Sequence, residues 1–315
     1  MIGIVLHTSG DLSSGRIPLL AVKPQNRRTF IATVGAAAVS VASACNAAPV
    51  PRRRLSRIGL QLYSVRKQME ADLPGTLAQV AAIGYKEVEF ANEVPFPPYF
   101  GHSPVEVREI LARNGLTSPS VHVPLKWMRN EWRKVLDDAR QVGHEWVVIP
   151  WLAEEDRPAS LDAWQRLAAE LNGAARIARE AGLRFGYHNH DFELKPVPGA
   201  AGEAGSTIPL DVLFAETDPS LVDFQLDLYW VVKGGGDPSS YFARFGKRIP
   251  LVHVKDSAGP PAHAMTDVGR GTIDFRRIFA DADKAIKHYY VEHDEPADPM
   301  ASIRNSYDYL KAIEY

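Results

Sequence analysis

The chain has 315 residues, 45% of them hydrophobic, and a formal net charge of -2. This length accommodates one large α/β domain with a complete core, and the near balance of acidic and basic residues excludes the strongly basic surface typical of nucleic-acid-binding proteins. Because Cys45 is the only cysteine, an internal disulfide scaffold is excluded as well.

Residues 1–54 have the pattern of a cleavable targeting segment and linker. An arginine pair at 27–28 precedes a mildly apolar run over 31–41, which is about half the ~20 residues that a membrane-spanning helix needs. The arginine pair resembles a twin-arginine export motif, and ASAC, ending at Cys45, resembles a lipobox in which that cysteine would carry a lipid anchor. Cleavage nearby without lipidation is the alternative. We therefore expect an exported protein, periplasmic or lipid-anchored facing the periplasm, with its domain at 55–315.

From Arg57 onward, short β-rich runs alternate with amphipathic helical stretches. The clearest helix is expected between Ser160, a suitable N-cap, and Gly182, a suitable stop, because apolar residues recur there at helical spacing. Shorter helices are expected at 76–84 and 105–115. The strands are expected at 57–63, 85–90, 118–124, 145–151, 183–189, 221–227, 249–255 and 288–294.

Eight strand–helix units within roughly 260 residues have the size and order of a (β/α)8 TIM barrel, an α/β fold. A doubly wound open sheet is the main alternative. Its dinucleotide-binding form requires a G-x-G-x-x-G turn after the first strand, whereas the first expected strand here is followed by SVRKQME. The sequence therefore favours the barrel.

Side chains that can bind a metal lie at the ends of the last four expected strands. The fifth strand offers His188 and His190, which strand alternation would place on one face. The sixth ends at Asp227, the seventh carries His253 and the eighth carries Glu292. Since catalytic residues of a TIM barrel project from the carboxyl ends of its strands, we expect these groups to converge, although a lone histidine at a strand end is more often an ordinary polar contact than a ligand. Imidazoles mixed with carboxylates suit one divalent metal ion, Mn, Zn, Fe or Co.

The motifs YHNHDFE, FQLDLYWVVKGGGDP, IPLVHVKD, VGRGTIDF and YYVEHDEP occur in this order. Together they resemble the sugar phosphate isomerase/epimerase family of xylose isomerase-like TIM barrels, over the whole chain beyond the targeting segment. The resemblance implies one divalent metal held by a Glu-Asp-His-Glu set, of which Asp227, His253 and Glu292 match the last three members. In place of the first glutamate this chain offers His188 or His190, and we favour His188 because it is nearer to the strand end.

The resemblance also implies proton abstraction beside a carbonyl, with a stabilised enediolate. We expect isomerisation or epimerisation of a sugar or keto-sugar, with Glu292 or an imidazole as the base. Family epimerases exchange the proton between two glutamates, and one is absent here, so Glu193 or another acid such as Lys255 would complete the reaction. One alternative is a lyase or dehydratase acting on keto-sugars or keto-glycosides by the same chemistry. Another is a non-catalytic barrel that binds sugar or metal.

Other residues near strand ends are candidate substrate contacts. His122 and Glu89 lie on earlier strands, Trp151 lies just past the fourth, and Arg270 lies in a glycine-containing loop after the seventh. His190 joins them if it is not the metal ligand. Each has an ordinary alternative, such as hydrogen bonding at the barrel end or aromatic packing. We expect a small-molecule sugar as the partner and no nucleic acid, and the sequence leaves a homo-oligomer open.

Overall fold

The computed structural model describes residues 53–92, 96–199 and 205–315. The expected targeting segment, including Cys45, lies almost wholly outside these ranges. Within them, no helix combines the length and the apolar composition that crossing a bilayer requires.

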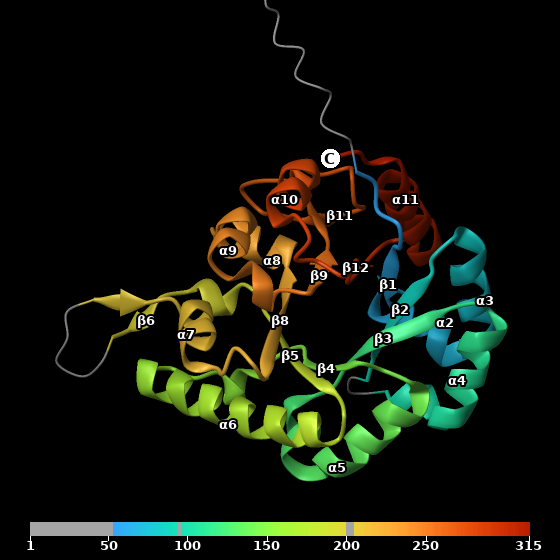
Figure 1. Ribbon diagram of the computed structural model, residues 1–315. Coiled ribbons are helices and arrows are strands. Elements are labelled where there is room, and N and C mark those ends of the chain that lie inside the picture. The colour runs from blue at the N-terminus through green and yellow to red at the C-terminus, as the bar shows by residue number, and fades with distance from the viewer. Residues whose placement is uncertain (1–52, 93–95, 200–204) are drawn as a thin grey trace, which may run out of the picture. The chain divides into compact units, whose positions relative to one another are not determined.

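Eight parallel strands close into a barrel in the order β1-β12-β9-β8-β5-β4-β3-β2, and helices form a layer around them (Figure 1). The barrel strands are β1 (Gly59–Gln61), β2 (Glu87–Ala91), β3 (Thr117–His122), β4 (Trp146–Ile149), β5 (Arg184–His188), β8 (Val222–Asp227), β9 (Leu251–Val254) and β12 (His288–Val291). The expected (β/α)8 TIM barrel is therefore confirmed, with a strand at each of the eight expected places.

The helices and minor elements follow the same alternation. The helices are α2 (Arg66–Ala71), α3 (Leu73–Ile83), α4 (Pro104–Arg113), α5 (Leu125–Val142), α6 (Leu161–Glu180), α7 (Pro209–Glu216), α8 (Leu228–Lys233), α9 (Pro238–Phe245), α10 (Phe275–Ala282) and α11 (Pro299–Ala312). The short 3₁₀ helices are η1 (Leu62–Val65), η2 (Pro98–Gly101), η3 (Glu154–Asp156), η4 (Phe192–Leu194) and η5 (Gly246–Arg248). Two small antiparallel ribbons pair β6 (Val197–Pro198) with β7 (Ser206–Thr207) and β10 (Asp256–Ser257) with β11 (Met265–Thr266).

Helix α6 shows why these segments form helices. The Ser160 side chain accepts a hydrogen bond from the Ala163 N–H, so it caps the first turn as the sequence indicates. The helix ends just before Gly182, whose φ of +80° lies in the left-handed region that glycine adopts without strain. Between these ends, Trp164 and Leu171 belong to the buried face that packs onto the barrel.

The barrel interior is layered. Trp146, Val148, Leu251 and Tyr290 form an apolar cluster separate from the main core between strands and helices. Gly59 leaves room for this layer, because a Cβ there would lie 2.6 Å from the Tyr290 ring. Side chains alternate along a strand, so His253, two positions after Leu251 on β9, falls one layer closer to the carboxyl ends. The apolar cluster is therefore the floor beneath the polar residues described next.

Candidate metal and catalytic site

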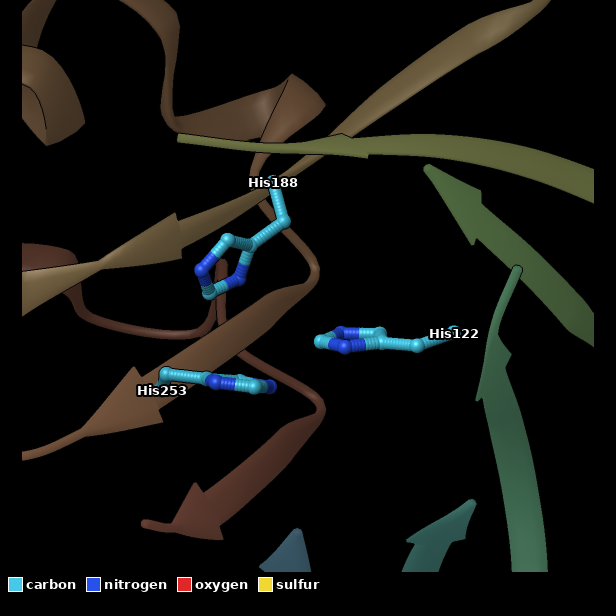
Figure 2. Close-up of side chains that lie close together, drawn as sticks. All are labelled: His122, His188 and His253. Carbon is cyan, nitrogen blue, oxygen red and sulfur yellow. The ribbon is translucent and has the colours of Figure 1, made fainter. Parts of the chain in front are cut away.

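Four strands bring the four expected metal-binding side chains together. His188 ends β5, Asp227 ends β8, His253 lies on β9 and Glu292 follows β12, and all four residues are buried. Ligand atoms of Asp227, His253 and Glu292 lie within 4.8 Å of one another, and the same holds for His122, His188 and His253. Figure 2 shows the three imidazoles reaching from separate strands toward one space.

His190 is placed differently from His188. Because β5 ends at His188, His190 lies in the following turn, so the expectation that both share a strand face was wrong. Its ring packs 5.0 Å from the ring of Trp230 and is stacked 6.0 Å from that of Phe192 (centroid distances). The turn nevertheless keeps His190 on the wall of the central cavity.

Gln225 fixes the orientation of His188. The Gln225 Nε2 donates to Glu89 Oε1 at 2.7 Å, so its Oε1 faces the other way and accepts from His188 Nδ1 at 3.0 Å. An imidazole that donates from Nδ1 while neutral carries its lone pair on Nε2. Burial, followed by the charges of neighbouring groups, holds the pKa of His188 well below its usual value, so the ring is neutral.

The Nε2 lone pair of His188 faces an acceptor rather than a donor. It lies 3.7 Å from Asp227 Oδ2, an oxygen that has no hydrogen bond among the described residues and whose ion-pair neighbour is the Lys255 ammonium at 3.4 Å. The other carboxylate oxygen, Oδ1, accepts from the Trp230 N–H at 2.9 Å. Two acceptors that face each other without a proton are satisfied by a cation between them, so these residues fit a divalent metal.

His253 lies between two carboxylates. Its Nδ1 is 2.7 Å from Glu292 Oε2 and its Nε2 is 2.6 Å from Glu89 Oε2, so both ring nitrogens donate and the ring is an imidazolium. Burial alone would lower the pKa of His253, but Glu292 and Glu89 raise it. His253 Nδ1 and Glu292 would have to give up the proton between them in order to hold a divalent cation together.

Glu89 is the hydrogen-bond acceptor that connects several residues of the site. The carboxylate is fully buried and does not line the cavity, although we expected it as a substrate contact. Burial would raise the pKa of Glu89, but its histidine neighbours hold it well below the usual range. The groups directed at its two oxygens are Gln61 Nε2, Ser120 Oγ, Gln225 Nε2, His122 Nε2 and His253 Nε2. Glu89 therefore positions the site residues and is shielded from the cavity.

Lys255 brings a positive charge to the same place. Its Nζ lies 2.6 Å from Glu292 Oε2, 2.9 Å from Asp294 Oδ1 and 3.4 Å from Asp227 Oδ2. Burial would lower the pKa of Lys255, but these three carboxylates raise it well above the usual value, so the ammonium persists at neutral pH. The same ammonium and His253 lower the pKa of Glu292 against the effect of burial. Burial raises the pKa of Asp227 to about 6.

A cavity of about 590 Å³ opens above these groups. Trp151 and His122 line it as expected, whereas Arg270 does not, and the Arg270 side chain is 64% exposed beside Asp267. Glu193 is also outside the lining. It is buried under the turn, where it accepts from Tyr187 Oη at 2.7 Å and from the His190 N–H at 2.8 Å. Burial raises the pKa of Glu193 to about 7.

The barrel fold agrees with the comparison to known families. Residues 77–313 match the family described as xylose isomerase-like TIM barrel. The chain belongs to that family. Inosose dehydratase of Lacticaseibacillus casei is 28% identical over 276 residues, covering 78% of this chain and 89% of the relative.

Solved structures superpose over most of this chain. A sugar phosphate isomerase/epimerase from Parabacteroides distasonis is 27% identical with a TM-score of 0.70, covering 86% of this chain and 97% of that one. The IOLI protein, solved with a zinc atom, has a TM-score of 0.61 at 16% identity over 80% of this chain and 95% of that one, which shows a common fold.

Four polar residues of the site were not singled out from the sequence: Gln61, Ser120, Gln225 and Asp294. A signal for two of them existed, because Ser120 and Gln225 each stand two positions before a candidate on the same strand, namely His122 and Asp227. Period-two alternation places such a neighbour on the same side of a strand. The contacts that give these residues a role depend on other strands.

Proposed function

We propose that this xylose isomerase-like barrel is a divalent-metal-dependent dehydratase acting on polyhydroxylated ketones. The proton on the carbon next to the carbonyl is removed, the C–O bond at the following carbon breaks, and the hydroxyl leaves as water. A free keto-sugar or keto-cyclitol has the required carbonyl and hydroxyl groups. The predicted export segment favours substrates without a phosphate group.

The histidine at the first metal-binding position carries this proposal. An epimerase of this family needs a carboxylate on each side of the substrate, one to remove the proton and one to return it. Here His188 stands where the first carboxylate would be, and Glu292 is the remaining member of the pair. Elimination needs only one base beside the carbonyl, so it does not require the missing carboxylate, and Glu292 remains available as a metal ligand. The similarity to inosose dehydratases, which cover most of this chain, supports the same choice.

Four residues would hold the metal: His188, Asp227, His253 and Glu292. A divalent cation bound there would polarise the ketone and stabilise the negative charge that develops on its oxygen. Two imidazoles with two carboxylates suit zinc, manganese, iron or cobalt better than a hard cation such as calcium.

His190 is the proposed base. Burial and the charge of Lys255 hold its pKa well below the usual value, so it is neutral and able to accept a proton. It lines the cavity, and its Nδ1 has no hydrogen-bond partner within the described ranges. Lys255, which stays protonated, donates a hydrogen bond to the departing hydroxyl. His190 passes the proton to that oxygen, so one water leaves and the enzyme returns to its starting state.

The test is product analysis in D₂O with the metal-reconstituted protein and a set of keto-cyclitols and keto-sugars. Dehydration gives a product lighter by one water, with absorbance from the new conjugated carbonyl. A product of the parent molecular formula that carries deuterium would instead support the isomerase or epimerase alternative. Tight binding of the ketone with neither exchange nor mass loss would favour the non-catalytic barrel.

A further inference from the structure

The central cavity is larger than the metal site requires and has two different halves. The inner half is polar, with His188, Lys255 and Glu292 on its wall. The outer half extends to the loops that follow β3 and β4, and its apolar wall is formed by Pro124, Leu125, Pro150, Trp151 and Ala153. A volume of about 590 Å³ is in the range that drug-sized ligands occupy, roughly 300–1,000 Å³. A single six-membered polyol on the polar half leaves the outer half unused.

Trp151 is the distinctive residue of the outer half. It is 44% exposed, and the other large hydrophobic side chains found exposed in the described part of the chain, Val105 and Ile177, do not line this cavity. An indole left open at a cavity wall is a surface on which the apolar face of a ring can stack.

The indole is held in place by a cation. The Arg157 guanidinium carbon lies 5.4 Å from the Trp151 ring centroid and 4.2 Å from that of Phe192. The Arg157 Nε also donates to the Leu152 carbonyl at 3.1 Å, which fixes the guanidinium between the two rings. Trp151 is therefore supported without being covered, as a preorganised stacking surface would be.

We propose that the substrate of this site is a keto-sugar joined to a second ring, and that the second ring stacks on Trp151. The inference rests on the proposed function, since the ketone ring occupies the polar half. The second ring is a sugar or an aromatic group, because both present an apolar face. Lys126 and Glu155, at the same rim, can bind hydroxyl groups of a second sugar.

Isothermal titration calorimetry with unreactive glycosides tests this in the full-length, metal-loaded protein. Methyl glucoside is the one-ring probe, and cellobiose and phenyl glucoside are the two-ring probes. We expect the two-ring probes to bind about tenfold more tightly than methyl glucoside. Trp151→Ala should abolish that difference while changing the affinity for methyl glucoside less than twofold, and Trp151→Phe should retain part of it. Val105→Ala, an exposed apolar position outside the cavity, is the matched control.

Equal affinity of the wild type for one-ring and two-ring probes would overturn the inference. An equal loss of affinity for all three probes in Trp151→Ala would overturn it as well. A preference for cellobiose identifies the second ring as a sugar, and a preference for phenyl glucoside identifies it as aromatic. Turnover of one-ring ketones is measured separately. If no one-ring ketone is turned over but the two-ring probes still bind more tightly through Trp151, the proposed dehydratase activity is contradicted. The inference of a two-ring substrate then still holds.

Discussion

His188 Nδ1 lies 3.0 Å from Gln225 Oε1, and this contact determines which nitrogen of the imidazole can bind a cation. The amide itself cannot turn around, because its Nε2 is committed to Glu89. A residue without charge therefore sets the tautomer of a proposed metal ligand, through a hydrogen bond one step removed from the metal.

Replacing Gln225 by methionine should weaken metal binding about 10- to 100-fold, because His188 loses the acceptor that keeps its lone pair on Nε2. Competition titration with a chromophoric chelator measures the effect. Gln61→Met is the matched control, because Gln61 also donates to Glu89, at 2.7 Å, but its Oε1 accepts from the Tyr63 N–H and not from His188. An unchanged metal affinity in a folded Gln225→Met protein would show that the tautomer is not set in this way.

Asp227→Asn should remove the metal without disturbing the fold. The amide oxygen of asparagine can still accept the hydrogen bond from Trp230 N–H that caps α8. The charge next to His188 Nε2 is lost, so we expect at least a tenfold lower metal affinity. Elemental mass spectrometry should find about one equivalent of metal in the wild type and much less in the variant.

The control for this experiment is Asp274→Asn, which changes another helix-capping aspartate, at the start of α10. It should bind as much metal as the wild type. Metal content that is equal in Asp227→Asn and Asp274→Asn would contradict the proposed ligand set.

The barrel could be predicted from the sequence because each of its units repeats the same pattern, a short β-rich apolar run followed by an amphipathic helical stretch. The run LRFGYHN predicts a buried strand, and the structure places β5 within it, ending at His188. Position at a strand end was enough to select Asp227, His253 and Glu292, since parallel strands of a barrel end at one rim.

The sequence could not show which partner each side chain has. Glu89 is on the second strand and was expected to contact substrate, but its oxygens are enclosed by donors from other strands. The position of His190 was also mispredicted. Side chains alternate with period two only within a strand, and β5 ends at His188, two residues before His190. Where a strand ends depends on pairing with its neighbours, which a single segment does not encode.

His190→Phe should separate catalysis from metal binding. Phenylalanine preserves the packing against Trp230 and Phe192 but cannot accept a proton. We expect dehydration to slow by about 10²–10⁴-fold, with metal content unchanged. His188→Phe should instead lose both. If His190→Phe loses its metal, His190 is a ligand; if it keeps full activity, another group is the base.

His144 should make the stability of the protein depend on pH. It is buried against Phe90 and Tyr99, its Nδ1 donates to the Ser118 carbonyl, and its Nε2 has no partner among the described residues. Burial lowers its pKa from 6.5 to about 4. Between these values the unfolded chain binds a proton that the folded protein does not. The stabilisation is therefore complete above pH 6.5 and is lost as the pH falls toward 4.

The change amounts to on the order of 3 kcal/mol, at about 1.4 kcal/mol for each pH unit of the shift. Urea unfolding of the wild type and of His144→Gln at several pH values between 7 and 4 measures it. Glutamine can still donate to the Ser118 carbonyl but does not titrate, so the variant should lose less stability on acidification, and the stability of the wild type relative to the variant should fall between pH 7 and pH 4. Parallel curves for the two proteins would show that His144 is not the group responsible.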